Sequence, residues 1–383
     1  MRYTTAGESH GRALTAIVTG VPAGIPLLGE EIDRDLARRQ QGYGRGGRQT
    51  IETDRVTILS GVRFGTTIGS PIALAVTNRD WDNWTGVMSA SGTKPEGIRE
   101  TRPRPGHADL PGVLKTASDD TRDILERASA RETAARVAAG GVAKALLRAL
   151  GVEVSSFVSS IGSVSIAPVA HPEAVDRDAV EASAVRCPDP DVSEAMKREI
   201  DSARADGESL GGTFVVVATG IVPGLGGYAE AGQKLDAKLA AAVVSIPAIK
   251  GFEVGEGFHL AEVRGSHAHD PIHHSDDTGF TRPTNHAGGV EGGMTNGEPL
   301  VVRAAMKPIP TLMSPLASVD LDTLEVVDAS KERSDVCAVP AAAVVAEAEV
   351  AMVLAEAYLD KFGHDALVDI LAARDAYLAR IAR

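Results

Sequence analysis

Arginine, histidine, serine and aspartate residues gather in a few glycine- and proline-rich segments of this 383-residue chain. Arginine forks and exposed backbone N–H groups bind carboxylate and phosphate oxygens, whereas histidine and aspartate transfer protons near neutral pH. Because the whole chain has a formal net charge of −13, the pattern predicts that these segments meet around a strongly anionic small molecule. The segments are AGESHGRA (6–13), ARRQQGYGRGGRQT (37–50), TRPRPGHADL (101–110), RASARET (127–133) and KERSDVCAVP (331–340).

Two histidines in these segments are the first candidates for proton transfer. His10 lies between Ser9 and Gly11 in an expected turn, where glycine leaves the ring accessible. A solvent-facing residue without a chemical role is the alternative, and we favour the chemical role. His107 follows prolines that stiffen the backbone and arginines that supply positive charge. Its alternative is a turn histidine bonded to Asp109.

The segments 127–133 and 331–340 add an anion site and a carboxylate. Ser129 precedes an expected helix, whose unpaired N–H groups and positive dipole would attract an anion beside Arg127 and Arg131. A plain helix cap is the alternative. Asp335 precedes a second apolar helix and is interpreted either as the cap of that helix or as a base.

Composition and charge argue against several classes of protein. The acidic balance disfavours nucleic acid or an anionic membrane as a partner, so GYGRGGR (42–48) is interpreted as an approach to phosphate or carboxylate rather than an RNA-binding box. No uncharged apolar run is long enough to span a bilayer, and we expect a cytoplasmic protein. Cys187 and Cys337 form no CxxC pattern, and Cys337 is expected to be a small buried apolar residue rather than a nucleophile.

A histidine-rich stretch, GSHAHDPIHH (265–274), offers a different chemistry. The cluster from His267 to His274, with Asp270, is dense, but its spacing fits no closed zinc pattern. We expect no metal and interpret the stretch as an exposed or substrate-covering loop. A metal-dependent phosphate-ester hydrolase built on this cluster is the alternative enzyme, and a non-catalytic anion or nucleotide binder is the alternative from another class.

Mixed strands and helices must position these segments. Mixed order, rather than strict alternation, favours an α+β fold, and no GxGxxG follows a strand to indicate a Rossmann site. The start SARE (129–132) has a capping-box pattern. The sequence predicts helices at 130–150, 191–205, 341–362 and 366–380 and strands at 56–62, 71–77, 155–165, 214–219 and 300–306.

Four stretches recur in the same order, which indicates a degenerate internal duplication. Chance likeness between strand-turn-helix units is the alternative. We expect one domain, residues 1–383, made of two similar halves (about 1–150 and 151–365) around a pseudo-two-fold axis, with 366–383 as a peripheral helix. The recurring pairs are ALTAIVTGVPAG (13–24) with FVVVATGIVPGLG (214–226), IDRDLA (32–37) with LDAKLA (235–240), TIGSPIALAV (67–76) with TNGEPLVVRA (295–304), and the apolar helices after residues 127 and 333.

Six long motifs occur in one order from residue 1 to about 365: GESHGRA, GYGRGGRQTIETD, RPRPGHADL, RASARETAARVAAG, GGMTNGEPLVVRAAMKPIPT and RSDVCAVPAA. With these motifs the chain closely resembles the chorismate synthase family. The resemblance implies a β-α-β sandwich with internal pseudo-symmetry, assembled as a homotetramer. It also implies an anti-1,4-elimination of phosphate from 5-enolpyruvylshikimate 3-phosphate to give chorismate, the seventh step of the shikimate pathway, with reduced FMN required.

The resemblance also assigns catalytic roles. His10 would protonate or stabilise the leaving phosphate, and His107 would hold the anionic edge of the reduced flavin. Asp335 would accept the proton through flavin N5. Whether NADPH reduces the flavin on this chain or a separate reductase does so is left open.

Binding residues follow from the same resemblance. Ala128, Pro247 and Pro310 stand where the family commonly has serine or another polar residue, so side-chain hydrogen bonds are not expected there. Substrate or nicotinamide contacts are expected from Ser9, Arg39, Arg45, Arg48 and Arg131. Flavin contacts are expected from Arg127, Ala128, Ser129, Pro247, Ala248, Gly292, Lys307, Pro308, Ile309, Pro310, Thr311 and Arg333.

Overall fold

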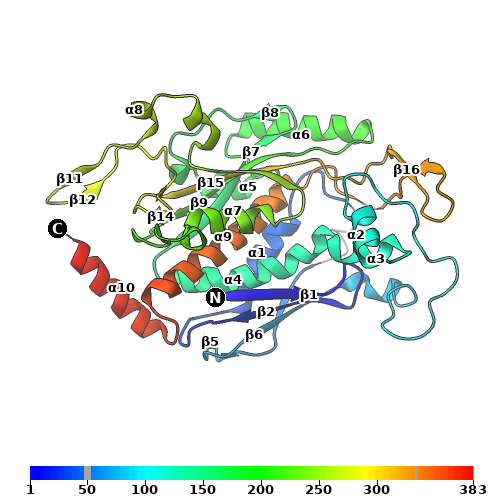
Figure 1. Cartoon of the computed structure of the whole chain (residues 1–383), viewed down its shortest axis with the longest axis horizontal. Helices are drawn as coiled ribbons and strands as arrows, with labels where there is room; N and C mark the ends of the chain where they lie inside the picture. Colours follow the sequence, from blue (N-terminus) through cyan, green and yellow to red (C-terminus); the bar gives the residue numbers. More distant parts are fainter. Residues whose placement is uncertain (47–52, 333, 383) are drawn as a thin grey trace.

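The structure is a computed structural model that describes residues 1–46, 53–332 and 334–382 (Figure 1). The described residues form two larger antiparallel sheets and several helices, a mixed α/β content. One sheet has the order β1-β2-β6-β3, made of Arg2–Ala6, Ala13–Thr19, Ile72–Thr77 and Val56–Ile58. The other has the order β10-β15-β9-β7-β8, made of Ile249–Val254, Leu300–Met306, Gly212–Thr219, Glu153–Ile161 and Val164–Ser165.

Two long helices lie at the centre of the molecule. Helix α4 (Thr133–Ala149) packs on β2 and β6, helix α9 (Val339–Phe362) packs on β7 and β9, and the two helices pack on each other (Figure 1). Almost every residue of α9 is buried, because a helix that is apolar all round must be enclosed by other elements. The helices approach closely at Gly140, where a side chain would collide with Ala348.

Two turns, one at Thr67 and one at Thr295, have the same hydrogen-bond pattern. Thr67 donates its hydroxyl to Pro22 O (2.6 Å) and accepts from the N–H of Ile25 (2.9 Å). Thr295 donates to the carbonyl of Val222 (2.7 Å) and accepts from the N–H of Leu225 (2.8 Å). The turn at Thr67 lies between α1 (Gly29–Gln40) and β6 in sequence, and its partners follow the end of β2. The turn at Thr295 lies between α7 (Leu235–Val244) and β15, and its partners follow the end of β9.

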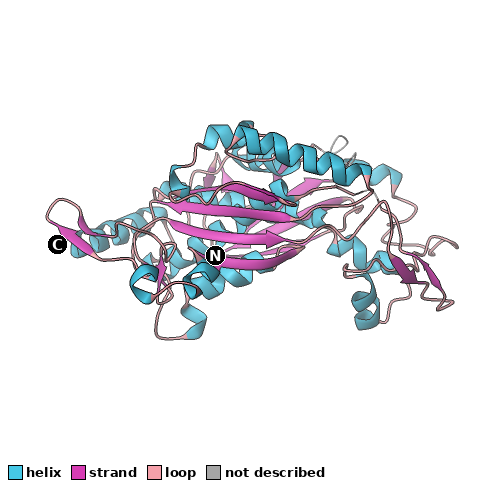
Figure 2. Cartoon of the chain, turned by 90° about the horizontal axis from the view of Figure 1, so that it is seen from above, coloured by secondary structure: helices cyan, strands magenta, loops and turns pink. Residues whose placement is uncertain are grey.

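The remaining elements are short or peripheral, and Figure 2 shows them around the main strands. Among the described residues, no helix has the length and apolar character needed to cross a membrane. The other helices are α2 (Asp109–Thr116), α3 (Thr121–Ala128), α5 (Arg177–Ala182), α6 (Pro190–Ala205), α8 (Gly265–Ala268) and α10 (Leu367–Ile381), with single turns at Arg79–Asn83, Ala130–Glu132, Pro172–Ala174, Ala231–Gln233 and Gly257–Ala261. The short strands are β4 (Val62–Arg63), β5 (Thr66–Thr67), β11 (His273–Ser275), β12 (Gly279–Thr281), β13 (Val290–Glu291), β14 (Met294–Thr295), β16 (Ala317–Val319) and β17 (Val326–Asp328).

Most predicted elements are confirmed, with corrected ends. The strand 300–306 is β15, and the helices at 191–205, 341–362 and 366–380 are α6, α9 and α10 with shifts of one or two residues. The strand predicted at 56–62 is wrong as one piece, because Gly61 adopts a positive φ of 82° and separates β3 from β4. Gly162, with a φ of 55°, likewise separates β7 from β8 within 155–165.

The start of the helix predicted at 130–150 also differs. A single 3-10 turn covers Ala130–Glu132 before α4 begins at Thr133. Ser129 accepts from the N–H of Arg131, but Glu132 pairs with Arg136 (2.7 Å) instead of returning to Ser129. The capping box is therefore half formed, because the half-buried Arg136 binds its glutamate.

Candidate active site

A cavity of about 680 Å³ lies where the arginine-bearing segments meet. Each of the five segments contributes at least one lining side chain, although they are far apart in sequence. The sequence-predicted residues that line it are Ser9, His10, Arg39, Arg45, His107, Ala128, Ser129, Arg131, Pro247, Ala248, Lys307, Ile309, Pro310, Thr311 and Asp335.

Other predicted site residues lie elsewhere. Arg127 is turned to the chain near β1, where its guanidinium donates to Gly7 O and Thr5 O. Gly292 lies in the turn between β13 and β14, and neither it nor Pro308 lines the cavity. Arg48 and Arg333 lie outside the described residues.

His10 is held by a buried carboxylate on α3. Its backbone N–H donates to one oxygen of Glu126 (2.8 Å), and its ring Nδ1 lies 2.8 Å from the other. Burial raises the pKa of Glu126, but the hydrogen bonds and charge of His10 and Arg122 outweigh it and hold that pKa below its usual value. The ring of Trp84 stacks on His10 with 3.7 Å between ring centroids. The turn at residue 10 is thus fixed by long-range contacts.

His107 is held in a similar way by Asp109, the first residue of α2. The distance from Nδ1 of His107 to Asp109 is 2.5 Å, and Nε of Arg104 donates to the same carboxylate (2.8 Å). Arg104 also donates to the hydroxyl of Thr311 (2.9 Å). Burial raises the pKa of Asp109, but these hydrogen bonds lower it well below its usual range. His107 therefore bonds Asp109, as the turn interpretation expects, and it also lines the cavity, while its chemical role stays a prediction.

Two buried arginines share one carboxylate at the cavity wall. Nη1 of Arg131 lies 2.7 Å from Asp54, and Nη1 of Arg39 lies 3.5 Å from the same group. That Arg39 nitrogen makes no hydrogen bond within the described part of the chain. Burial lowers the pKa of the Arg39 guanidinium, and the nearby charges of Arg131 and Arg45 lower it too, although Asp54 raises it. An incoming anion would supply the missing compensation.

Asp335 faces Arg45 at the opposite end of this arginine cluster. Nη1 of Arg45 lies 2.8 Å from its carboxylate, and the N–H of Gly46 donates to the same group (2.7 Å). Helix α9 begins four residues later at Val339, with Ala338 as its cap. The interpretation of Asp335 as a helix cap is therefore wrong, because Arg45 and Gly46 hold its carboxylate away from the helix N-terminus.

One wall of the cavity is apolar. It is formed by residues that precede β10 and by the first turns of α9, including Ile246, Ala341 and Val345. Lys307, at the end of β15, donates its ammonium to the carbonyl of Gly106 (2.6 Å), and burial lowers its pKa. An apolar wall opposite arginines suits a flat aromatic group with an anionic tail.

Sequence reasoning missed several residues that hold the site together. Asn78 donates to the carbonyls of Gly11 (2.7 Å) and Ser9 (3.3 Å) and accepts from Nε of Arg131 (2.9 Å), so one amide joins two segments. Glu126 and Trp84 were missed too. Glu126 precedes the RASARET segment directly, and this adjacency is a signal that could have found it, whereas Asn78 and Trp84 carry no comparable sequence signal.

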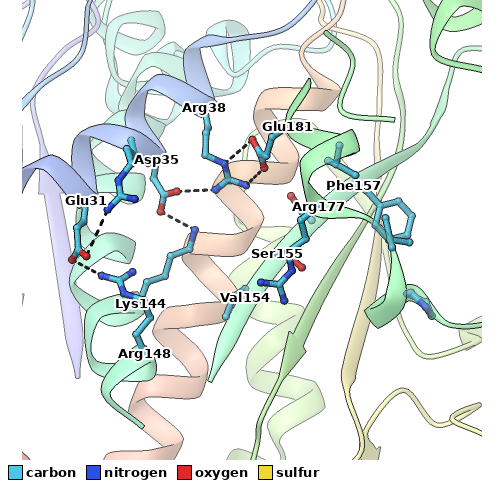
Figure 3. Close-up of a pocket in the computed structure, with 15 residues that line it drawn as sticks. Glu31, Asp35, Arg38, Lys144, Arg148, Val154, Ser155, Phe157, Arg177 and Glu181 are labelled. Atoms are coloured by element: carbon cyan, nitrogen blue, oxygen red, sulfur yellow. Dashed lines mark hydrogen bonds and ion pairs between the residues drawn. The ribbon is translucent and has the colours of Figure 1, made fainter. Parts of the chain in front are cut away.

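A second pocket, of about 390 Å³, has a different character (Figure 3). Lys144 donates to Asp35 (2.8 Å), and Arg38 pairs with Asp35 (2.7 Å) and Glu181 (2.7 Å). Each of these cations faces a carboxylate of the same pocket. Because its charges compensate one another, this pocket offers an incoming anion little.

The histidine-rich stretch does not form a metal site in the structure. In the described ranges, no three His, Cys, Asp or Glu side chains are grouped so that they could hold a metal ion. Asp270 instead accepts from Thr284 (2.6 Å) and from the backbone N–H of His286 (2.8 Å). His273 and His274 belong to the exposed hairpin β11–β12. The metal-dependent hydrolase alternative therefore gains no support.

Arginine-bearing segments of a mixed α/β fold meet at a cavity with apolar residues on one wall, and carboxylates hold two of its histidines. Such a site is typical of an enzyme that acts on a small, multiply charged anion. The sequence model described as "Chorismate synthase" matches residues 1–359. This chain belongs to the chorismate synthase family.

Individual relatives agree over their whole length. The chorismate synthase of Symbiobacterium thermophilum is 57% identical over 393 residues, with 100% of both chains covered. That of Moorella thermoacetica is 57% identical over 385 residues, again with 100% of both covered. A solved structure titled "Crystal Structure of Chorismate Synthase" superposes with a TM-score of 0.81 at 42% identity, covering 100% of this chain and 98% of the other. The resemblance found in the sequence is thereby confirmed.

Proposed function

We propose that this chain is a lyase that converts 5-enolpyruvylshikimate 3-phosphate to chorismate and phosphate in the 680 Å³ cavity. The family relationship supports the activity, a step of the shikimate pathway. The observation that carries the location is that His10, His107, Arg39, Arg131 and Asp335 line one cavity. A substrate with one phosphate and two carboxylates matches this excess of guanidinium groups.

Reduced FMN is the proposed cofactor, and the residues present fit it. The apolar wall suits its ring system, and the buried Nη1 of Arg39 and Nε of Arg45 have no hydrogen-bond partner among the described residues. Ala128, Ser129, Pro247, Ala248 and the residues 307–311 would hold it. The chemistry that reduced FMN supplies when bound is transient electron density for C–O cleavage, without net redox change. NADPH is proposed only as its reductant.

Side chains of the cavity have distinct proposed tasks. The His10 ring donates a proton or hydrogen bond to the leaving phosphate, and Arg39 and Arg131 bind anionic groups of the substrate or cofactor. His107, held by Asp109, provides a fixed hydrogen-bonding ring beside the apolar wall. The Asp335 carboxylate accepts the proton that leaves the substrate. General acid or base catalysis of this kind contributes roughly 10²- to 10⁴-fold each.

Departures from the family pattern limit some contacts. Ala128, Pro247 and Pro310 line the cavity but carry no hydrogen-bonding side chain, so only their carbonyls and the N–H of Ala128 are available. Contacts from Arg48, Gly292, Pro308, Arg127 and Arg333 stay predictions.

The larger architecture belongs to the same proposal. We infer a β-α-β sandwich in which the halves at about 1–150 and 151–365 are related by a pseudo-two-fold axis, with residues 366–383 peripheral. The matching turns at Thr67 and Thr295 and the matching strand orders β1-β2-β6-β3 and β7-β9-β15-β10 support it. A homotetramer and a cytoplasmic location complete the proposal, and the two free cysteines agree with a reducing compartment.

Phosphate release tests the function directly. Purified protein with photoreduced FMN, under anaerobic conditions and without nicotinamide, is expected to release phosphate from 5-enolpyruvylshikimate 3-phosphate. A His10→Ala variant is expected to lose roughly 10²- to 10⁴-fold in kcat. A chelator should change nothing. Absence of phosphate release by the wild type would remove the proposed function, and wild-type turnover by His10→Ala would remove His10 from it.

A further inference from the structure

Glu126 is buried directly behind His10, with a side chain that is 1% exposed. The backbone N–H of His10 donates to one of its oxygens, and ring Nδ1 of the same residue lies beside the other, both at 2.8 Å. Nη1 of Arg122 donates to the same carboxylate (3.0 Å). Two N–H donors and the ring nitrogen Nδ1 therefore converge on a group that, when ionised, only accepts hydrogen bonds.

We propose that Glu126 is a positioning residue for the elimination, which holds His10 in the tautomer with the proton on Nδ1. An ionised carboxylate accepts from Nδ1, so Nε2 becomes the ring nitrogen that gains and gives the proton during the reaction. The same logic fixes the tautomer of the histidine in hydrolase triads. This inference rests on the proposed role of His10.

The plane of the His10 ring is fixed by a second contact. Trp84 stacks on it at an interplanar angle of 24°, and the indole N–H of Trp84 donates to Asp80 (3.1 Å). Arg122 lies 5.2 Å from the Trp84 ring centroid, so the same guanidinium contacts the stacking partner and the carboxylate. Glu126 sets which nitrogen carries the proton, and Trp84 sets the direction in which the ring points.

Arg122 also connects this assembly to the segment that carries Asp335. Its Nη2 donates to Glu332 (2.8 Å), three residues before Asp335. A single guanidinium thus links the carboxylate behind His10 to Glu332, in the segment that carries Asp335. Neutralising Glu126 is expected to loosen this tie as well as the tautomer.

Glutamine and aspartate at position 126 separate positioning from packing. Glu126→Gln keeps the volume but leaves one acceptor oxygen for the backbone N–H and for Nδ1, so we expect kcat to fall roughly 100-fold with KM changed less than about threefold. Glu126→Asp keeps two acceptors and is expected to recover kcat to within about tenfold of wild type. Nitrogen-15 NMR of histidine-labelled protein is expected to show His10 protonated on Nδ1 in the wild type and as mixed tautomers in Glu126→Gln.

Matched controls make the outcomes distinct. His171 and Glu173 form a similar pair (3.1 Å) on the exposed surface, and Glu173→Gln is expected to leave kcat and the His10 signal unchanged. An Nε2-protonated His10 in the wild type would overturn the inference without any variant, as would wild-type kcat in Glu126→Gln. If His10→Ala also turned over normally, the proposed function of His10 would be at fault instead.

Discussion

Two pockets of this molecule hold similar side chains in different electrostatic states. Behind Arg38 and Lys144 of the smaller pocket, Glu347 is fully buried and accepts from Arg38 (2.8 Å), Lys144 (2.7 Å) and Ser156 (2.6 Å), so these cations are compensated. In the larger cavity, Nη1 of Arg39 lies 3.5 Å from Asp54, which also pairs with Arg131, and this nitrogen makes no hydrogen bond among the described residues. Removing one partner of a compensated buried pair destabilises the fold, whereas a buried cation without a full counter-charge can bind an anionic ligand. The position of the counter-charges, more than the number of cations, separates structure from function.

Loss of Glu347 would show the structural side of this comparison. Glu347→Gln leaves Lys144 and Arg38 buried without a full counter-charge, and we expect the free energy of unfolding to fall by about 3 to 5 kcal/mol. Urea denaturation measures it, and kcat of the folded fraction should not change. Burial raises the pKa of Glu347, but the charges of Lys144 and Arg38 outweigh burial and hold that pKa below its usual value. The ionised carboxylate therefore stabilises the fold above about pH 4.5, and this contribution is lost as the pH falls. An unchanged unfolding free energy would contradict the comparison.

Loss of Arg39 would show the functional side. Arg39→Met removes a charge that is only partly compensated among the described residues, and we expect KM for the substrate to rise about 100-fold, a loss near 2.7 kcal/mol. Because Arg39 also donates to Thr133 (2.9 Å) and Ala130 O (3.1 Å), the unfolding free energy is expected to fall by about 1 to 2 kcal/mol, less than in Glu347→Gln. Steady-state kinetics and urea denaturation measure the two effects. Arg34→Met, on the same helix but beside Glu31 in the compensated pocket, is the matched control and should leave KM unchanged. A large loss of stability in Arg39→Met would place Arg39 with the structural charges.

Asp109 is a carboxylate beside the larger cavity whose charge is compensated by Arg104, so it combines the structural and the functional setting. Asp109→Asn is expected to lower the unfolding free energy by about 1.5 kcal/mol at neutral pH, since Arg104 and His107 lose a charged acceptor. The folded pKa of Asp109 lies below its unfolded value near 3.8, so its contribution is present above that pH and lost below it. Denaturation measured from pH 7 to pH 3 should show the difference between variant and wild type shrinking. A constant difference would argue against the ion pair.

Cys337 should show the smallest effect. It is buried beside the start of α9, and burial raises the pKa of its thiol to about 12. We expect Cys337→Ala to leave kcat unchanged and to cost less than about 1 kcal/mol of stability. Iodoacetamide at pH 8 should label this cysteine only after unfolding, as mass spectrometry can check. Rapid labelling of the native protein would reopen the nucleophile interpretation.

Much of the site was predictable because its motifs are local. Glycine, proline and arginine at short spacing predicted an anion site in the segments around His10, His107 and Arg131, and these segments line one cavity. The strand prediction at 56–62 included Gly61, because the positive φ of a glycine does not change the alternation of apolar and polar residues. The capping box failed halfway because Arg136, four residues beyond Glu132, forms a stronger charged pair with it.

The amino-acid sequence by itself determined the family, the long apolar helices and the chemical character of the arginine-rich segments, since these follow from short-range pattern and residue type. Only the tertiary structure decided that Glu126 holds His10, that Asn78 joins two segments and that Asp54 serves two arginines. Such contacts join residues separated by up to 116 positions, as in the pair of His10 and Glu126. Chain folding around α4 and α9 brings them together, and no local propensity encodes that meeting.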